Sequence, residues 1–258
     1  MALKVGIFVD SLRRPIDEGL QLAAEWKVDC FQVYVTSGEM LAANMPATAR
    51  AAFVERYRGL GLELSATCGD FGLNFADAEL MAAKAEALTA AIDQTVDLGA
   101  SIMTTHIGSI GDDPDGSRAR AMAGSLKRFG DYAADRGVVL ATETGLESGA
   151  RLREIIEMAD TRGIGVNFDP ANLVMRGFDY LQAVRDLGAL IVHSHAKDGR
   201  RRDGRGEETP LGAGEVDFPA YVEAMRAVGY DGAYVIEREA GDDPIADVKQ
   251  AVAFVKAL

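Results

Sequence analysis

The sequence predicts an α/β protein of one kind, the closed (β/α)8 or TIM barrel, formed as a single domain by residues 1–258. Apolar segments of strand length alternate with amphipathic segments of helix length, and this alternation requires a parallel sheet with helical crossovers. We count eight strand–helix units along the chain, the number that closes this barrel. The length of 258 residues also suits one such barrel.

The predicted strands are nearly all apolar, whereas strands exposed on one face alternate between apolar and polar residues. Continuous apolar runs are typical of strands covered on both faces, as in a parallel sheet inside a shell of helices. In chain order the eight predicted strands are Lys4–Val9, Cys30–Val35, Glu63–Thr67, Ser101–His106, Val138–Glu143, Gly165–Asp169, Leu190–His195 and Ala233–Glu237.

A stretch with apolar residues at helical spacing follows each predicted strand. Between residues 76 and 98, for example, leucine, alanine, isoleucine and valine recur every three or four positions, which indicates one buried helix face. The eight predicted helices are Ile16–Trp26, Ala49–Leu60, Ala76–Leu98, Ser117–Arg136, Ala150–Asp160, Phe178–Leu187, Phe218–Val228 and Pro244–Leu258.

An open, doubly wound sheet would show the same alternation. Such a sheet usually carries a glycine-rich phosphate-binding turn directly after its first strand. Residues 9–14 stand at that position and contain no glycine. No linker or low-complexity segment divides the chain, so we expect one barrel.

The composition disfavours several classes of protein. The chain has 27 Lys and Arg against 40 Asp and Glu, and a net charge of −13 is unfavourable for a nucleic-acid partner. The one basic cluster, residues 200–205, reads as a solvated loop. No segment is suited to span a bilayer or to act as a signal peptide, and two cysteines are too few for a disulfide scaffold. We therefore expect a cytoplasmic protein with reduced thiols and no membrane partner, while a homo-oligomeric state stays open.

Four consecutive predicted strands end in a residue that can bind a metal ion. These residues are Glu143, Asp169, His195 and Glu237. Catalytic residues of such barrels gather where the strands end, so the four side chains are expected to converge at one mouth. Three carboxylates and an imidazole suit a divalent ion such as Mn²⁺, Co²⁺, Mg²⁺ or Zn²⁺, and without a cation the carboxylates would repel one another.

Structural roles for the same residues are the alternative. An acid directly after a strand is often a helix cap, which applies to Asp169, and Glu237 could pair with Arg238. A histidine in an apolar strand is usually hydrogen-bonded in the core. Residues two apart in a strand point to the same side, so both His193 and His195 can face the barrel lumen. We predict that His195, nearer the strand end, is the ligand and that His193 lies deeper.

Several short segments together resemble a known family. They are Thr142-Glu143, residues 167–172 (NFDPAN), residues 193–198 (HSHAKD), residues 212–218 (GAGEVDF) and residues 229–232 (GYDG) before Glu237. In this order and spacing the chain is similar to the sugar phosphate isomerase/epimerase family of the xylose isomerase-like TIM barrel superfamily, which includes ketose 3-epimerases and inosose-processing enzymes.

The resemblance implies one divalent metal ion, commonly Mn²⁺ or Co²⁺, held by Glu143, Asp169, His195 and Glu237. It also implies that Glu143 and Glu237 are the catalytic acid/base pair, on opposite faces of a small carbohydrate substrate. The metal would bind the substrate carbonyl and stabilise an enediolate, while the two glutamates exchange the proton.

Substrate-binding residues are expected at His106, Asn172, Lys197 and Arg201. Arg201 stands where the family has an arginine that contacts substrate oxygens, six residues after the ligand histidine. Asn172 replaces a substrate-binding histidine of many relatives, and Gly149 replaces a second glutamate of the epimerases. Core packing for His106 and a solvated or salt-bridged side chain for Lys197 are the alternatives.

These departures leave the reaction open within one class. A metal-dependent isomerase or epimerase of a small sugar or keto-sugar is the first expectation, and a lyase or dehydratase acting on a keto-sugar or inosose would use the same site. An apurinic-site endonuclease of the superfamily needs a histidine-rich trinuclear zinc cluster, for which three histidines are too few. A non-catalytic barrel is the remaining alternative.

Overall fold

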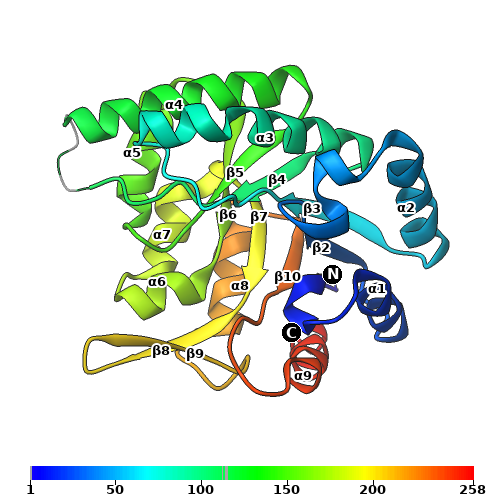
Figure 1. Cartoon of the computed structure of the whole chain (residues 1–258). Coiled ribbons are helices and arrows are strands. Elements are labelled where there is room, and N and C mark those ends of the chain that lie inside the picture. Colours follow the sequence, from blue (N-terminus) through cyan, green and yellow to red (C-terminus); the bar gives the residue numbers. More distant parts are fainter. Residues whose placement is uncertain (1, 112, 114–115) are drawn as a thin grey trace.

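The computed structural model describes residues 2–111, 113 and 116–258, and in it parallel strands close into a barrel (Figure 1). Around the barrel the strands follow one another in the order β1-β10-β7-β6-β5-β4-β3-β2. Their bounds are β1 Lys4–Phe8, β2 Cys30–Tyr34, β3 Glu63–Cys68, β4 Ile102–Thr105, β5 Val139–Glu143, β6 Ile164–Phe168, β7 Ile191–Ala196 and β10 Ala233–Ile236. The predicted fold is confirmed, and every predicted strand is present with its ends shifted by at most one residue.

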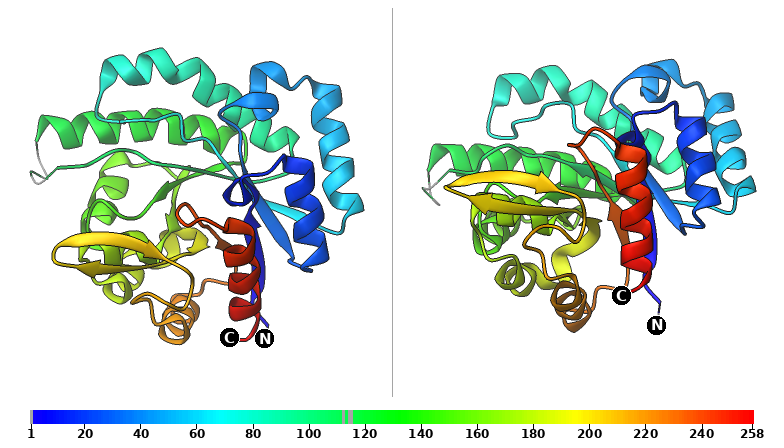
Figure 2. Two further views of the ribbon diagram at one scale, coloured as in Figure 1. Left: turned by 60° about the horizontal axis from the view of Figure 1, so that its bottom comes forward. Right: turned by 90° about the horizontal axis from the view of Figure 1, so that it is seen from below.

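Helices cover the outside of the barrel in all three views (Figures 1 and 2). They are α1 Ile16–Glu25, α2 Ala47–Gly59, α3 Ala78–Asp97, α4 Ser117–Asp135, α5 Gly149–Ala159, α6 Pro170–Arg176, α7 Tyr180–Leu187, α8 Phe218–Ala227 and α9 Pro244–Lys256. Asp and Ser side chains accept a backbone N–H at the first turn of α3 and α5 to α9, which satisfies donors that a helix start leaves unpaired. None of the helices in the described ranges is long and apolar enough to cross a membrane.

The ends of the predicted helices are shifted by at most two residues, and beyond this two segments differ from the sequence prediction. The helix α6 follows β6 directly, and the predicted helix Phe178–Leu187 begins only at Tyr180, as α7. The prediction of a loop at residues 200–205 is wrong. These residues belong to an antiparallel hairpin of β8 Asp198–Arg202 and β9 Arg205–Thr209. Its two-residue turn has positive φ at Asp203 (49°) and Gly204 (77°), the conformation that Asp-Gly favours in tight hairpins.

The hairpin projects from the end of β7 and is fixed to the barrel at its base (Figure 1). The Asp198 carboxylate accepts the backbone N–H groups of Gly212 at 2.9 Å and Gly214 at 2.8 Å. At the other strand, the buried carboxylate of Glu208 accepts a hydrogen bond from the Arg238 guanidinium directly after β10. The base of the hairpin is thereby held beside the end of the barrel where β7 and β10 finish.

Both cysteines are free and buried, in agreement with the expectation of reduced thiols. Burial raises the pKa of the Cys30 thiol to about 12, and the same cause raises the pKa of Cys68. Neither side chain lies among the residues that could hold a metal. Their role is packing inside the barrel.

Close packing between α4 and the start of β6 requires glycine at position 163. A Cβ atom placed on Gly163 would lie 1.8 Å from the carbonyl oxygen of Gly130 in α4. We expect Gly163→Ala to lower the free energy of unfolding by about 3 kcal/mol or more, because backbone must move to relieve the overlap. Urea unfolding followed by circular dichroism measures this loss.

The matched control is Gly124→Ala, in the exposed part of the same helix α4. Nothing lies within 4 Å of a Cβ atom at Gly124. This change is expected to stabilise the protein by about 0.5–1 kcal/mol, because alanine favours a helix interior over glycine. Equal effects of the two substitutions would contradict the packing argument.

Candidate metal and active site

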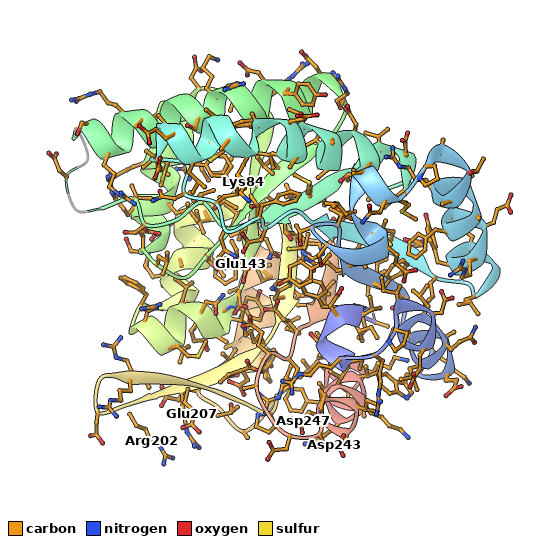
Figure 3. All side chains as sticks on the ribbon, viewed as in Figure 1. Lys84, Glu143, Arg202, Glu207, Asp243 and Asp247 are labelled. Carbon is orange, nitrogen blue, oxygen red and sulfur yellow. The ribbon has the colours of Figure 1, made fainter. Side chains whose placement is uncertain are left out.

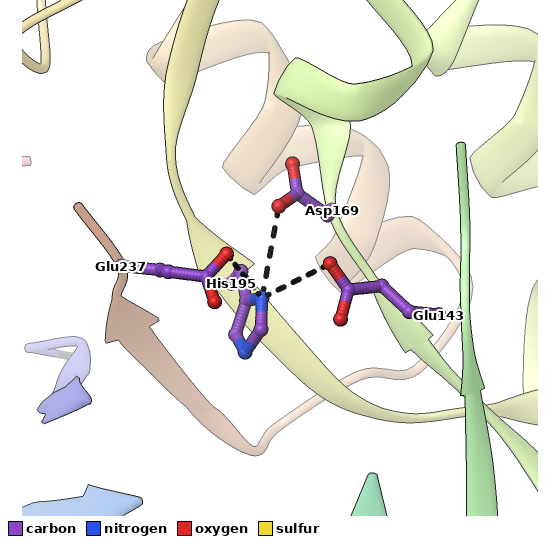
Figure 4. A group of neighbouring side chains, drawn as sticks. All are labelled: Glu143, Asp169, His195 and Glu237. Atoms are coloured by element: carbon purple, nitrogen blue, oxygen red, sulfur yellow. Dashed lines mark ion pairs between the residues drawn. The ribbon is translucent and has the colours of Figure 1, made fainter. Parts of the chain in front are cut away.

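The four residues predicted at consecutive strand ends come together at one mouth of the barrel (Figure 4). One ligand atom from each of Glu143, Asp169, His195 and Glu237 lies within 4.8 Å of all the others. The Nδ1 atom of His195 is 3.3 Å from Oε2 of Glu237, 3.6 Å from Oε1 of Glu143 and 3.6 Å from Oδ2 of Asp169. We call these four residues the acid–histidine cluster.

The donor set of the acid–histidine cluster fits a divalent ion. The side chains are buried, and Oδ2 of Asp169 has no hydrogen-bond partner although it is fully shielded from solvent. An unpaired buried carboxylate oxygen is unfavourable, and a cation at the centre would satisfy it. Three carboxylate oxygens and one imidazole nitrogen form a mixed set of the kind that Mn²⁺, Co²⁺ and Zn²⁺ accept.

The geometry of Asp169 suits both roles that the sequence offered as alternatives, helix cap and metal ligand. Its Oδ1 accepts the backbone N–H of Asn172 at 3.0 Å and thereby caps α6. Its Oδ2 points to Nδ1 of His195 within the cluster. The cap therefore fixes the carboxylate in the orientation that presents its second oxygen to the cluster.

His195 is oriented by Gln32, a residue that the sequence reading did not single out. Nε2 of His195 lies 2.9 Å from Oε1 of Gln32, whose amide nitrogen in turn donates to Oγ1 of Thr104 at 2.8 Å. Because an amide oxygen can only accept, Nε2 carries a proton whether the ring is neutral or charged, and Nδ1 is the nitrogen that faces the carboxylates. Burial opposes the charged ring, but Glu237 and Glu143 outweigh it and raise the pKa of His195 well above its ordinary value. A glutamine inside an apolar strand was the signal available in the sequence.

His193 lies outside the cluster, with its ring centroid 5.7 Å from that of His195. Its Nδ1 is 2.8 Å from Oδ1 of Asn167, and its Nε2 is 3.3 Å from the Ser65 hydroxyl. Burial and the nearby His195 hold the pKa of His193 well below its ordinary value, so its ring is neutral. Both histidines face the lumen, as predicted, and His195 is the one beside the carboxylates.

Lys197 contacts the cluster rather than the open cavity. Its Nζ donates to Oε2 of Glu237 at 2.9 Å and to Glu239, and lies 3.8 Å from Oδ2 of Asp169. Burial opposes the ammonium, but Glu237 and Asp169 outweigh it and raise the pKa of Lys197 well above its ordinary value. Glu237 is thus paired with Lys197, whereas Arg238 binds Glu208 and Asp247. The predicted contact of Lys197 with substrate stays a prediction.

A cavity of about 580 Å³ opens at the mouth beside the cluster, with Glu143 in its wall. Three of the predicted substrate residues, His106, Asn172 and Arg201, line it, together with Glu147 and Arg176, which were not predicted. Oε1 of Glu143 accepts from Nδ2 of Asn172 at 2.8 Å. The volume of the cavity is in the usual range for pockets that hold small molecules.

His106 stands at the wall of this cavity, directly after β4. Its Nδ1 is 2.8 Å from the Asp70 carboxylate, and its Nε2 is 3.9 Å from Oε2 of Glu143. The negative charge of Glu143 and the hydrogen bond that His106 donates to Asp70 raise the pKa of His106 to about 9. The side chain is half-exposed, so the alternative of core packing does not hold.

Comparisons with known proteins show the family to which the chain belongs. Residues 20–258 match the model of the family described as xylose isomerase-like TIM barrel. Over 133 residues, 44% of this chain, the sequence is 29% identical to an inosose dehydratase of Geobacillus thermodenitrificans, and the match spans 45% of that protein. The chain therefore spans less than half the length of this relative.

Solved structures share the fold over nearly the whole chain. A xylose isomerase domain protein from Planctomyces limnophilus has a TM-score of 0.86 and 23% identity, covering 99% of this chain and 96% of that one. An L-ribulose 3-epimerase has a TM-score of 0.79 and 19% identity, covering 100% of this chain and 94% of that one. The resemblance inferred from the sequence motifs is confirmed: the chain belongs to the xylose isomerase-like TIM barrel family.

Proposed function

We propose that the protein is a divalent-metal-dependent epimerase or isomerase of a small sugar or keto-sugar. The observation that carries this proposal is the arrangement of two glutamates around the acid–histidine cluster. Glu143 and Glu237 approach His195 from opposite sides, and they come from β5 and from the end of β10 (Figure 4). Two bases on two sides of one site are what inversion at a carbon atom requires.

Glu143, Asp169, His195 and Glu237 would hold the ion, for which Mn²⁺ or Co²⁺ is our prediction, with Mg²⁺ or Zn²⁺ as alternatives. When bound, such an ion acts as a Lewis acid that polarises a carbonyl and acidifies the adjacent C–H group. Related proteins of this fold carry the names of a 3-epimerase and an inosose dehydratase, which supports carbonyl chemistry on polyhydroxylated substrates.

The residues of the chain account for the proton transfers. Glu143 reaches the cavity, and the amide groups of Asn172 and Asn167 hold its two oxygens at 2.8 Å and 3.2 Å. Glu237 is held by Lys197 at 2.9 Å. One carboxylate removes the proton from one face of the substrate carbon, and the other returns a proton to the opposite face. His106, in the wall of the cavity, hydrogen-bonds a substrate hydroxyl.

Dehydration is the second candidate, favoured by the match to an inosose dehydratase. The first step would be the same proton removal by a glutamate. A hydroxyl group next to the resulting carbanion would then leave as water, and it needs a proton donor in the cavity. His106, hydrogen-bonded to Asp70 in the cavity wall, is placed to give that proton.

The two reactions are separated by one experiment. The Mn²⁺- or Co²⁺-loaded protein is incubated in D₂O with a panel of ketoses, keto-sugars and inososes and followed by NMR. Epimerisation or isomerisation replaces a C–H by C–D and yields a second sugar, whereas dehydration yields an unsaturated or deoxy-keto product. The absence of exchange with every member of the panel would overturn both.

The wider setting stays a prediction. We propose a cytoplasmic protein that acts on a small carbohydrate, without a nucleic-acid or membrane partner. The absence of a nucleic-acid partner is supported by the charge of the chain, since 40 acidic against 27 basic residues disfavour binding to polyanions. A DNA-binding assay at low salt tests this prediction, and no binding is expected.

Metal binding is expected to raise thermal stability. Adding Mn²⁺ or Co²⁺ to chelator-treated protein should increase Tm by several degrees, because the ion binds the folded state and relieves repulsion among three carboxylates. The control is Asp169→Asn, since asparagine caps α6 as well as aspartate does but removes a charge from the cluster. An equal shift in the variant would show that the ion binds elsewhere.

A further inference from the structure

We propose that Arg176 and Arg201 together bind an anionic group of the substrate, a phosphate or a carboxylate, at the outer end of the cavity. The substrate of this site would then be a charged sugar derivative rather than a neutral sugar. This inference rests on the proposed function, because it concerns the substrate of the same cavity.

The two arginines reach one cavity from different elements. Arg176 is the last residue of α6, Arg201 belongs to β8 of the hairpin, and both line the cavity that Glu143 also lines. Two guanidinium groups on facing elements can bind the oxygens of one phosphate or carboxylate through paired hydrogen bonds.

Neither guanidinium has a partner among the described residues, although acids outnumber bases in the chain by 40 to 27. The neighbouring Arg200 is paired, at 2.8 Å, with Glu207 of the facing strand, and Arg238 is paired with Glu208 and Asp247. Within the part of the chain that the structure describes, Arg201 donates one hydrogen bond outside its strand ladder, from its backbone N–H to Glu215. The two arginines that face the cavity are therefore free to bind a ligand.

Glycine makes room for Arg201 at the end of α6. A Cβ atom on Gly177 would lie 2.6 Å from Nη1 of Arg201, and Gly177 has a φ of 86°, which also favours glycine. The guanidinium thus occupies the space of the missing side chain, beside Arg176. On the same side, Gly206 of β9 lies so near α6 that a Cβ atom there would be 2.5 Å from Cβ of Met175. This packing holds the hairpin, which carries Arg201, against the end of α6, which carries Arg176.

Charge is divided along the cavity. Its inner end holds Glu143 and the nearby His106 and adjoins the acid–histidine cluster, whereas Arg176 and Arg201, which lack an acidic partner among the described residues, are at the hairpin side. Glu147 is the other acid in the wall, but its Oε1 accepts the backbone N–H of Ile110 at 2.6 Å and is turned toward that loop. A molecule with a carbonyl and hydroxyls at one end and an anion at the other matches this distribution.

The test compares three ligands on the Mn²⁺-loaded protein by calorimetry: a ketopentose, its 5-phosphate, and the matching sugar acid. The proteins are the wild type, Arg176→Ala, Arg201→Ala and the control Arg202→Ala. Arg202 is an exposed arginine of the same hairpin, on its outer side and away from Glu143 (Figure 3). It does not line the cavity.

The wild type is expected to bind one of the two anionic ligands at least about 10-fold more tightly than the neutral sugar, and the tighter one identifies the anion. Arg176→Ala and Arg201→Ala should each weaken that binding by about 10- to 100-fold, while Arg202→Ala should change it less than about 2-fold. Where turnover is measurable, KM should rise by a similar factor with kcat little changed, because the contact is far from the reacting carbon.

Equal binding of neutral and anionic ligands, or an equal loss in Arg202→Ala, would overturn the inference. The two proposals fail in different ways. Arginine-dependent binding of the anion without any proton exchange would sustain the anion site and remove the proposed function. Proton exchange in a neutral ketose that is unaffected by Arg176→Ala and Arg201→Ala would sustain the proposed function and remove the anion site.

Discussion

Glu143→Gln and Glu237→Gln are each expected to lower the rate of complete conversion by at least about 1000-fold. A positioned general base contributes about 10²- to 10⁴-fold, and each variant also removes a charge from the acid–histidine cluster. The glutamine keeps the length of the side chain and one oxygen, so the overall shape of the site is conserved. The measurement is NMR in D₂O with the substrate that the panel identifies.

The two variants should differ in the exchange that remains. If each glutamate serves one face of the substrate, Glu237→Gln retains the base for one epimer and Glu143→Gln the base for the other. Each variant should then incorporate deuterium into only one epimer without converting it to the second. The same residual exchange in both variants would contradict the assignment of one glutamate to each face.

Glu147→Gln is the control for a change of charge in the same cavity. Glu147 lines the cavity, but its carboxylate binds the backbone of Ile110 and is not part of the cluster. A change of less than about 10-fold is expected in this variant, since the group is not placed to act as a base. A loss as large as that of Glu143→Gln would mean that the charge of the cavity matters more than the position of the base.

His195→Ala is expected to weaken Mn²⁺ or Co²⁺ binding by more than about 100-fold, whereas His193→Ala should weaken it by less than about 10-fold. Nδ1 of His195 faces three carboxylates at 3.3–3.6 Å, while His193 is bonded to Asn167 and Ser65. Metal content after dialysis and competition with a metal indicator measure the affinity. The opposite ranking would show that His193 is the ligand.

Gln32→Leu extends this comparison to the residue that orients His195. Loss of the contact between Gln32 and Nε2 would free the ring to turn or to change tautomer, with an expected loss of about 10- to 100-fold in metal affinity. Thermal unfolding of each chelator-treated variant separates a loss of metal affinity from a loss of fold. A variant that unfolds at the same temperature as the wild type but binds no metal supports the ligand assignment.

The sequence predicted the barrel because each strand is an uninterrupted apolar run that the next amphipathic segment follows. The same regularity located Glu143, Asp169, His195 and Glu237, since the end of a buried strand is where a charged residue is conspicuous. The roles of these residues as ligands remain predictions. Gln32 was missed because its importance depends on a contact with His195, far away in the chain. Arg176 was missed because its place in the sequence does not reveal that it lines one cavity with Arg201 of the hairpin.

Two structural elements were missed although local signals existed. Asp169 and Pro170 form a helix start, with a capping side chain and proline in the first turn, but α6 is only seven residues long. In the hairpin, Asp203-Gly204 is a tight-turn sequence. Its flanks carry charged residues in place of an apolar face, so they resembled a loop.

The charged flanks of the hairpin also affect how the protein behaves at high concentration. In the part of the chain that the structure describes, closure gives each barrel strand a neighbour on both sides, whereas β8 and β9 form a sheet of two strands, each with one open edge. An open edge can pair with a strand of another molecule and start aggregation. Three consecutive arginines, Arg200 to Arg202, lie along β8, and β9 carries Arg205, Glu207 and Glu208. Desolvating such charges is unfavourable. The residues that made the hairpin difficult to predict thus protect the protein from self-association through β-strand pairing.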